Sequence, residues 1–286
     1  MMTTEKTPTR RKRLRRWLLI VTVLVLLVAF FLQQQNHIKM QTVDIYDPSL
    51  PAAFDGLRIV HLSDNHGKEF GENNERLLAK VAAMKPDLIA LTGDIIDQAS
   101  QMNMLPALAK GLSEIAPTYY VTGNHEWAVR RVNDLKKMLA ENGVRVLSNE
   151  YELWEKDGFT LAVAGVDDPN GLLGQKTGEE LRGEIEADYT ILLSHRDTVD
   201  SYARWGYDLV LCGHGHGGII RVPLIDKGVL GTRRNLFPKY DGGLVAYEQG
   251  GYCFVSRGLG SNTVPIPAFR LFNRPDLPLL ILHSEG

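Results

Sequence analysis

Five short apolar segments in this chain each end in a polar motif that contains histidine, aspartate or asparagine. The segments read IVHLS, LIALT, YYVT, TILLS and DLVLC, and the motifs at their ends are Asp64-Asn65-His66, Gly93-Asp94 with Asp97, Gly123-Asn124-His125-Glu126, Ser194-His195 and Gly213-His214-Gly215-His216. Short apolar runs bounded by turn residues are typical of buried strands. Because ligands in open α/β sheets bind beyond the carboxyl ends of the strands, the five motifs are predicted to meet at one rim of one sheet.

The segments around these motifs follow the pattern of a domain in which strands and helices alternate. Apolar side chains at helical spacing predict helices, and short apolar runs between Gly, Pro or charged residues predict strands. The predicted strands are 57–62, 88–91, 119–121, 144–147, 152–154, 160–164, 189–193 and 209–211, and the predicted helices are 73–84, 104–115, 132–141 and 178–187. Residues 218–282 hold short strand-like runs separated by Gly and Pro turns. The pattern predicts an α/β domain with a β-rich C-terminal part.

The N-terminus combines a basic segment with an uncharged apolar run. Residues 1–16 hold seven basic side chains and one acid, and residues 17–32 read WLLIVTVLVLLVAFFL. The run suits a membrane-spanning helix whose flanking arginines reach the interface. We therefore expect a cytoplasmic tail at 1–16, a transmembrane anchor at 17–35, a linker at 36–54 and a globular domain at 55–286. A cleaved signal peptide is the alternative. The excess of basic residues before the run predicts that the globular domain lies outside the cytoplasm.

Charge and cysteine content narrow the classes of function. Residues beyond 16 hold 25 basic and 33 acidic side chains, so the globular part is acidic. A nucleic-acid-binding surface would normally be basic, and we therefore expect no nucleic acid as a partner. Cys212 and Cys253 both lie in apolar strand-like segments and are expected to be buried thiols. Sequence leaves open whether they pair, because a disulfide requires neighbouring strands.

The residue types in the five motifs suit divalent transition metals. Imidazole and carboxylate ligands bind Mn, Fe, Zn, Co or Ni, and the motifs lack the thiolates of a structural zinc site. The motifs offer seven ligands, namely Asp64, His66, Asp94, Asn124, His195, His214 and His216. Seven ligands are too many for one cation but suit a pair about 3.5–4 Å apart. Asp94 is the expected bridge, because Gly93 allows a tight turn there.

Taken together, the motifs resemble the signature of the calcineurin-like metallophosphoesterases: D-x-H, GD-x-x-D, GNH(D/E), a lone H and GH-x-H. The likeness spans residues 64–216 and implies a four-layer sandwich of two sheets flanked by helices, with 55–286 as the catalytic domain. It also implies a role for each motif position. Asp64, His66 and His216 would hold one metal, Asn124, His195 and His214 would hold the other, and Asp94 would bridge them. His125 would face the substrate without binding metal, and Glu126 would be the orienting group.

The family resemblance implies hydrolysis of a phosphomonoester, phosphodiester or pyrophosphate by a hydroxide that bridges two metals. His125, as an imidazolium, would protonate or stabilise the leaving group. The alternative is a binding module that keeps this fold without catalysis. The end of the chain, with Ser256-Arg257-Gly258-Leu259-Gly260 and the run 269–275, resembles a membrane-associated bacterial branch. That branch includes phosphodiesterases and UDP-2,3-diacylglucosamine pyrophosphatases, and it favours a lipid- or envelope-linked substrate.

Several other polar residues lie in or near the motifs. Asp97 is expected either to support a metal ligand or to cap a helix. His61 is expected to be a buried sheet residue and not a ligand. Arg221 and Arg257 are candidate phosphate contacts, although a structural role is the favoured interpretation for each. Asp197 stands where many relatives have a proline, which affects the loop after His195 and not the ligand itself.

Overall fold

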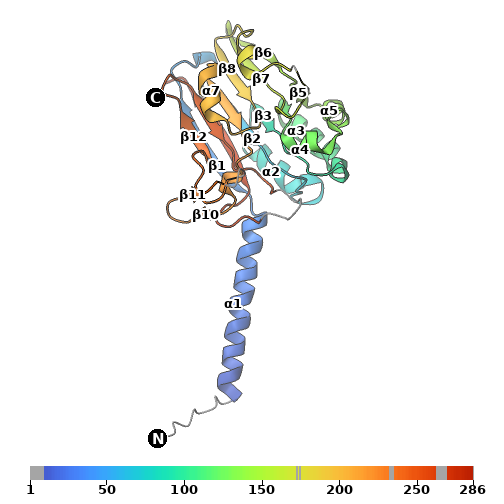
Figure 1. Cartoon of the computed structure of the whole chain (residues 1–286), viewed down its shortest axis with the longest axis vertical. Helices are drawn as coiled ribbons and strands as arrows, with labels where there is room; N and C mark the ends of the chain where they lie inside the picture. The colour runs from blue at the N-terminus through green and yellow to red at the C-terminus, as the bar shows by residue number, and fades with distance from the viewer. Residues whose placement is uncertain (1–9, 172, 174, 232–234, 262–268, 286) are drawn as a thin grey trace.

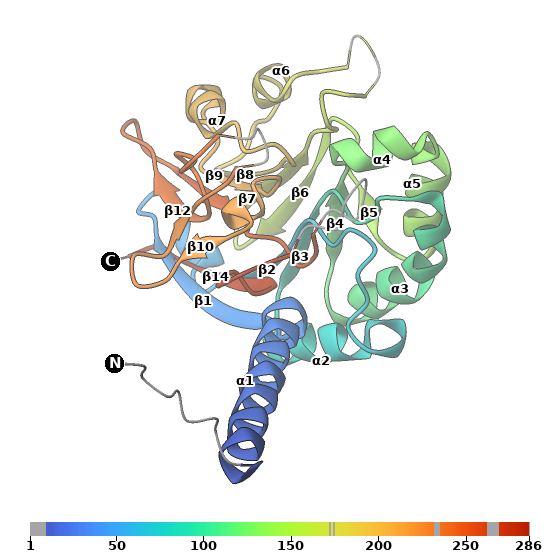
Figure 2. The ribbon, with the colours of Figure 1, turned by 60° about the horizontal axis from the view of Figure 1, so that its bottom comes forward.

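Two six-stranded sheets pack face to face and are covered on their outer faces by helices. The computed structural model describes residues 10–171, 173, 175–231, 235–261 and 269–285. The first sheet has the order β1-β14-β2-β3-β4-β5 and the second the order β12-β13-β9-β8-β7-β6. Figure 2 shows α2 to α5 on one side of the strands and α6 and α7 on the other. The expected four-layer α/β sandwich is confirmed.

The first sheet carries the strands that follow the early motifs. Its strands are β1 (Lys39–Tyr46), β2 (Arg58–Leu62), β3 (Leu88–Thr92), β4 (Thr118–Val121), β5 (Arg145–Val146) and β14 (Asp276–His283). The helices on its outer face are α2 (Glu75–Ala83), α3 (Leu105–Ile115) and α5 (Val132–Glu141), with the short α4 (Asn124–Val129) at the end of β4. Strands β2, β3, β4 and β5 run parallel, so their carboxyl ends meet at one edge.

The second sheet carries the later motifs. Its strands are β6 (Glu150–Lys156), β7 (Phe159–Gly165), β8 (Tyr189–Leu193), β9 (Leu209–Cys212), β12 (Gly243–Ala246) and β13 (Tyr252–Val255). The covering helices are α6 (Gly178–Arg182) and α7 (Val199–Trp205). A separate small hairpin joins β10 (Arg221–Val222) to β11 (Lys227–Gly228). Helix α6 ends five residues earlier than the predicted 178–187, because the chain turns at Gly183 and Glu184 bonds back to Leu181.

Three apolar clusters fill the spaces between the four layers. Alternate residues of one strand belong to different clusters: Val60 of β2 packs toward the helices, whereas Ile59 packs toward the other sheet. In the second sheet, Val163 faces the first sheet and Ala162 faces the outer helices. Strands buried on both faces need apolar side chains at every position. This explains why the segments before the motifs are continuously apolar.

The interpretation of 36–54 as a linker is wrong for residues 39–46. Residues Lys39–Tyr46 form β1, which pairs in parallel with β14 from the opposite end of the chain. The strand lies at the edge of its sheet, and most of its side chains alternate between half-buried and exposed. Such an edge strand has too few apolar residues to be recognised by its pattern alone.

A single long helix projects from the domain. Helix α1 (Arg10–Asn36) stands clear of both sheets (Figure 1), and its apolar side chains are exposed. It is long and apolar enough to cross a membrane, and no other helix among the described residues meets that test. The helix includes the predicted anchor and begins seven residues before it, so the basic segment continues the same helix from Arg10.

The two cysteines lie side by side in the second sheet as free thiols. Strand β9 carries Cys212 and its neighbour β13 carries Cys253, and both side chains are fully buried. Their sulfur atoms are 3.6 Å apart. The hydrogen bond with Cys253 and burial raise the pKa of Cys212 well above its usual value. The expectation of buried thiols is confirmed.

His61 is a buried sheet residue, as expected, and it makes the domain sensitive to acid. Its Nε2 lies 2.7 Å from the Thr92 hydroxyl, and burial lowers its pKa to about 3. The unfolded chain takes up this proton near pH 6.5, whereas the folded chain resists it. Stability is therefore full above pH 6.5 and falls as the pH drops toward 3.

We expect this one proton to lower the free energy of unfolding by about 2 kcal/mol between pH 8 and pH 5. The His61→Gln variant should lose correspondingly less stability over that interval, whatever its stability at pH 8. Denaturant unfolding of the detergent-solubilised chain, followed by tryptophan fluorescence at both pH values, measures the difference. Equal losses in the two proteins would show that His61 is not the source.

Candidate metal centre and active site

The five predicted motifs meet at one edge of the sandwich, with ligand residues supplied by both sheets. Loops after β2, β3 and β4 carry Asp64, His66, Asp94 and Asn124, and loops after β8 and β9 carry His195, His214 and His216. The first two loops are joined through their backbones, because the Asp64 amide donates to the Gly93 carbonyl at 3.0 Å and the His66 amide donates to the Asp94 carbonyl at 2.9 Å.

Most of these residues have an unusual backbone. Positive φ angles between 49° and 67° occur at five of the seven, namely Asp64, His66, Asp94, His214 and His216. Residues other than glycine rarely adopt this left-handed region, and such strain collects at functional sites. Gly93 also has a positive φ, of 76°, and a Cβ there would lie 2.3 Å from the Gly123 amide nitrogen. The close turn expected at Gly93 therefore requires glycine.

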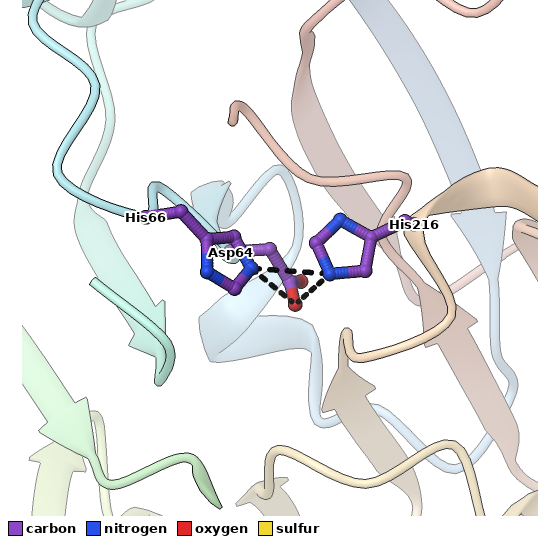
Figure 3. Close-up of side chains that lie close together, drawn as sticks. All are labelled: Asp64, His66 and His216. Carbon is purple, nitrogen blue, oxygen red and sulfur yellow. Dashed lines mark hydrogen bonds and ion pairs between the residues drawn. The ribbon is translucent and has the colours of Figure 1, made fainter. Parts of the chain in front are cut away.

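One group of three ligand residues lies beside β2. His66 Nε2 and His216 Nε2 are 3.1 Å apart, and both face the Asp64 carboxylate at 3.9 and 3.5 Å (Figure 3). All three residues are buried. The three side chains point at one another from two sheets, so a cation between them would satisfy all three.

A second group lies beside β3. His195 Nε2 is 3.1 Å from the Asp94 carboxylate and 3.1 Å from His214 Nδ1. His195 Nδ1 lies 2.8 Å from the Thr92 carbonyl, which fixes the ring and leaves Nε2 directed into the site. The two groups are adjacent, because the His214 backbone amide donates to Asp64 at 3.1 Å.

Electrostatics keeps the two carboxylates ionised and two of the imidazoles neutral. Burial alone would raise the pKa of Asp64, but His216, His195 and His66 lower it below its usual value. Asp94 behaves in the same way, mainly through His195. Burial lowers the pKa of both His214 and His216 to about 3. Their nitrogen lone pairs are therefore available to a cation.

His195 is the exception, because Asp94 outweighs burial and raises its pKa to about 10. Without a cation the His195 imidazole is protonated and pairs with the Asp94 carboxylate. A metal at this position would displace that proton, since metal ligands must be deprotonated.

The side chains gathered at this edge could hold divalent cations. The Asn124 Oδ1 atom is buried and has no hydrogen-bond partner within the described structure. An orphaned buried acceptor is costly, and a cation is one of the few partners that could satisfy it. The ligands are imidazole, carboxylate and amide, which suit transition metals. Asp64, His66 and His216 would hold one cation, and Asp94, Asn124, His195 and His214 would surround the other.

Asp97 contacts two histidines, and its neighbour Gln98 is the N-cap of the short helix that follows. Its Oδ1 lies 2.5 Å from His66 Nδ1 and 2.9 Å from His125 Nδ1. Metal-binding histidines usually donate their second nitrogen to such a carboxylate, which fixes the tautomer and the ring orientation. These contacts are those expected if Asp97 supports a predicted ligand, His66.

His125 lies at the mouth of the site. Its side chain is 21% exposed, and its Nε2 is 3.8 Å from Asp94. Burial lowers the pKa of His125, but hydrogen bonding to Asp97 and the charge of Asp94 outweigh burial and raise it. The proton-bearing form that a general acid needs is therefore favoured.

Glu126 holds the loops and does not face the open site. Its carboxylate is fully buried and accepts hydrogen bonds from the backbone amides of Gly123, Asp94 and Ile95 at 2.7–2.9 Å. Burial and the nearby Asp94 carboxylate raise its pKa to about 7. Glu126 thus fixes the backbone that carries Asp94, and any orienting role acts through that backbone.

We expect Glu126→Gln to weaken metal binding and turnover about 10- to 100-fold, because a neutral amide accepts backbone hydrogen bonds poorly and can donate where only acceptors fit. Metal competition titration and kcat measure the two effects. The matched control is Glu179→Gln, which changes an exposed acid on α6. Wild-type metal affinity in Glu126→Gln would show that this carboxylate does not support the site.

One ion pair beside the site was not anticipated. Arg196 forms a two-pronged pair with Asp168, at 2.5 and 3.0 Å, and its Nη1 lies 3.4 Å from His214 Nε2. The one sequence feature that could have indicated a role for Arg196 near the site is its position next to His195. Arg221 and Arg257 instead have structural partners. Both pair with Asp226, and the buried Arg221 also donates to backbone carbonyls.

Comparison with known proteins agrees with this geometry. A family model described as Calcineurin-like phosphoesterase matches residues 57–218. An uncharacterized metallophosphoesterase of Aquifex aeolicus is 32% identical over 87% of this chain and 93% of its own length. Phosphodiesterase YaeI of Escherichia coli is 27% identical over 79% of this chain and 82% of its own length.

The name of a further relative describes it as a transmembrane protein. The transmembrane protein with metallophosphoesterase domain of Danio rerio is 27% identical over 86% of this chain and 57% of its own length. Together with α1, this relative indicates membrane anchoring. The family match covers all five motifs and more than half of the chain. The chain therefore belongs to the calcineurin-like phosphoesterase family and is a phosphoester hydrolase.

Proposed function

We propose that this protein is a membrane-anchored hydrolase whose active site holds two divalent cations bridged by Asp94. The observation that carries the proposal is the pair of adjacent three-residue groups, Asp64 with His66 and His216 and Asp94 with His195 and His214, within which ligand atoms lie within 4.8 Å of one another. The unpartnered Asn124 oxygen supports a cation in the second group. When bound, two such cations would supply a water molecule of lowered pKa and would stabilise charge on the phosphoryl oxygens.

The chain's own residues would supply the remaining requirements. His125 would hold a proton on Nε2 for the departing oxygen, while Asp97 fixes the opposite nitrogen. When the bond between phosphorus and that oxygen breaks, the proton passes to the oxygen and His125 becomes neutral. Asp97 and Glu126 would act as positioning residues, because each contacts ligand-bearing elements and lies away from the open side of the site.

The proposed substrate is an organic phosphodiester, phosphomonoester or pyrophosphate that is lipid- or envelope-linked. The α1 helix supports this choice, because an anchored enzyme meets membrane-bound phosphates at high local concentration. The basic residues that precede its apolar run support an active site outside the cytoplasm. The metals would be drawn from Mn, Fe, Zn, Co and Ni.

Metal analysis combined with a substrate panel tests this function. We expect about two transition-metal ions per chain and metal-dependent hydrolysis of bis-p-nitrophenyl phosphate, p-nitrophenyl phosphate or a nucleotide pyrophosphate by the detergent-solubilised protein. The preferred substrate in this panel gives the type of bond. A fully metal-loaded protein that cleaves none of the three would contradict the proposal and favour a non-catalytic binding module.

A further inference from the structure

Apolar side chains gather on the part of the domain that surrounds the end of α1. Outside α1, thirteen large apolar side chains are exposed among the described residues, and eight of them fall within 224–272. The six that are at least 45% exposed are Leu224, Ile225, Leu236, Phe237, Phe269 and Phe272. We call these six residues the apolar rim. Single exposed apolar residues are ordinary, but a gathering of this kind marks an interaction surface.

The members of the apolar rim come from segments that lie together. Leu224 and Ile225 form the turn of the β10–β11 hairpin. Leu236 and Phe237 run beside the end of that hairpin, because the Phe237 amide donates to the Val229 carbonyl at 2.9 Å. Figure 1 places β10 and β11 at the edge of the domain from which α1 leaves.

Contacts with α1 fix the depth of the apolar rim. The ring centroids of Phe272 and Phe30 are 5.6 Å apart, and those of Phe269 and Phe31 are 5.9 Å apart. Phe30 and Phe31 lie near the end of the apolar run, where a spanning helix leaves the hydrocarbon. The two rim phenylalanines must therefore lie at the bilayer surface when α1 spans.

Hydrogen bonds hold the domain and α1 in this arrangement. The Gln35 side chain donates to the Arg270 carbonyl at 2.6 Å and accepts from the Arg270 amide at 3.1 Å. A two-way bond of this kind sets the orientation of the 269–272 segment on the helix. The domain is thus seated on the end of α1 and is not simply tethered by a flexible linker.

The residue that follows this segment contacts the predicted metal site. Asn273 follows Phe272, and its side-chain amide donates to the His216 carbonyl at 2.7 Å. On the other side, the buried Arg270 donates to the Gly260 carbonyl, and the Gly260 amide donates to the Asp64 carbonyl at 2.7 Å. The segment that carries the two rim phenylalanines is therefore linked to the backbones of two predicted metal ligands, to His216 through Asn273 and to Asp64 through Arg270 and Gly260.

We propose that the apolar rim inserts into the interfacial layer of the bilayer and that the active site works at the level of the lipid headgroups. The substrate would then be a phosphoester carried by an amphiphile that stays in the membrane while its phosphate enters the site. The choice of a bilayer as the occupant rests on continuity with α1, because Phe269 and Phe272 of the rim pack against Phe31 and Phe30 near the end of the helix's apolar run. The statement about substrate rests on the proposed function, and the docking itself does not.

A fluorescent label on the rim tests the docking without using activity. The full chain is placed in nanodiscs of phosphatidylcholine and phosphatidylglycerol, with the polarity-sensitive dye NBD attached to Ile225→Cys. The native Cys212 and Cys253 are fully buried and should not react. The matched control is Phe159→Cys, which is a 43% exposed position at the start of β7.

We expect the dye at position 225 to show blue-shifted emission and quenching by spin-labelled lipid, and the dye at position 159 to show neither. Identical behaviour at both positions would overturn the proposal. A blue shift without quenching by lipid would also overturn it, because a protein partner or a second copy would then cover the rim.

Charged substitutions test the statement about substrate. We expect Ile225→Asp combined with Phe237→Asp to lower kcat/KM about tenfold or more toward hexadecyl p-nitrophenyl phosphate carried in phosphatidylcholine vesicles. Hydrolysis of soluble bis-p-nitrophenyl phosphate should stay unchanged, and Phe159→Asp should change neither rate. An equal loss on both substrates, or on neither, would contradict a role for the rim. If the wild type cleaves neither substrate, the proposed function fails, while the dye still reports whether the domain docks.

Discussion

Replacing Asp94 by alanine is expected to lower phosphoesterase activity at least about 10³-fold and to release metal from the protein. Asp94 lies 3.1 Å from His195 Nε2, and its other oxygen accepts from the His125 amide at 2.9 Å. Removing the carboxylate therefore removes the predicted bridge between the two cations. It also removes the hydrogen bond that holds the loop carrying Asn124. Metal content after gel filtration and kcat on bis-p-nitrophenyl phosphate measure both effects.

The matched control for Asp94→Ala is Asp134→Ala, which removes an exposed carboxylate in the first turn of α5. This variant should keep full activity and metal content. If Asp94→Ala keeps its metals and a wild-type rate, the bridging role is refuted, and with it the dinuclear arrangement.

Replacing His125 by alanine is expected to keep the metals but lower turnover about 10²- to 10⁴-fold on substrates with poor leaving groups. His125 is a partly exposed histidine, and its Nδ1 is held by Asp97. An alkyl phosphodiester needs its departing alkoxide protonated, whereas p-nitrophenolate leaves without help. The loss should therefore be much smaller on bis-p-nitrophenyl phosphate.

The two substrates make the comparison decisive for His125. Rates of the wild type and His125→Ala on an alkyl phosphodiester and on bis-p-nitrophenyl phosphate are measured at the same metal content. A wild-type rate on the alkyl substrate would rule out proton donation by His125. An equal loss on both substrates would indicate that His125 binds the phosphoryl group instead.

Local pattern predicted the interior of the sandwich well because both faces of the central strands are covered. Helix α5 and strand β8 have the predicted bounds, 132–141 and 189–193. Strand β1 was missed, since its partner β14 lies more than 230 residues away and its own side chains are mostly half-exposed. Pairing between strands from the two ends of a chain cannot be predicted from a short stretch of sequence.

The same limit applies to the site. The position of each motif after an apolar run indicated that the predicted ligands would lie close together, because parallel strands end at a shared edge. The contacts around the ligands depended on packing across that edge. Asp97 bonds to His66 and His125, and Glu126 turns inward to the backbone of the Asp94 loop, although its sequence position suggested a place in the open site. The pair of Arg196 with Asp168 joins two loops of the second sheet and follows no spacing rule.

The supply of ligands by both sheets has a mechanical consequence. Asp64 comes from one sheet and His216 from the other, so a cation held by both would act as a reversible cross-link at the open end of the sandwich. Elsewhere the sheets adhere through apolar packing and through hydrogen bonds such as those of Trp154 to Tyr119 and of Tyr189 to Asp47, and none of these contacts involves a predicted metal ligand. The free energy that holds the two sheets together at this edge would therefore rise with the logarithm of the free cation concentration. Loss of metal would both inactivate the enzyme and weaken the contact between the sheets at the active site.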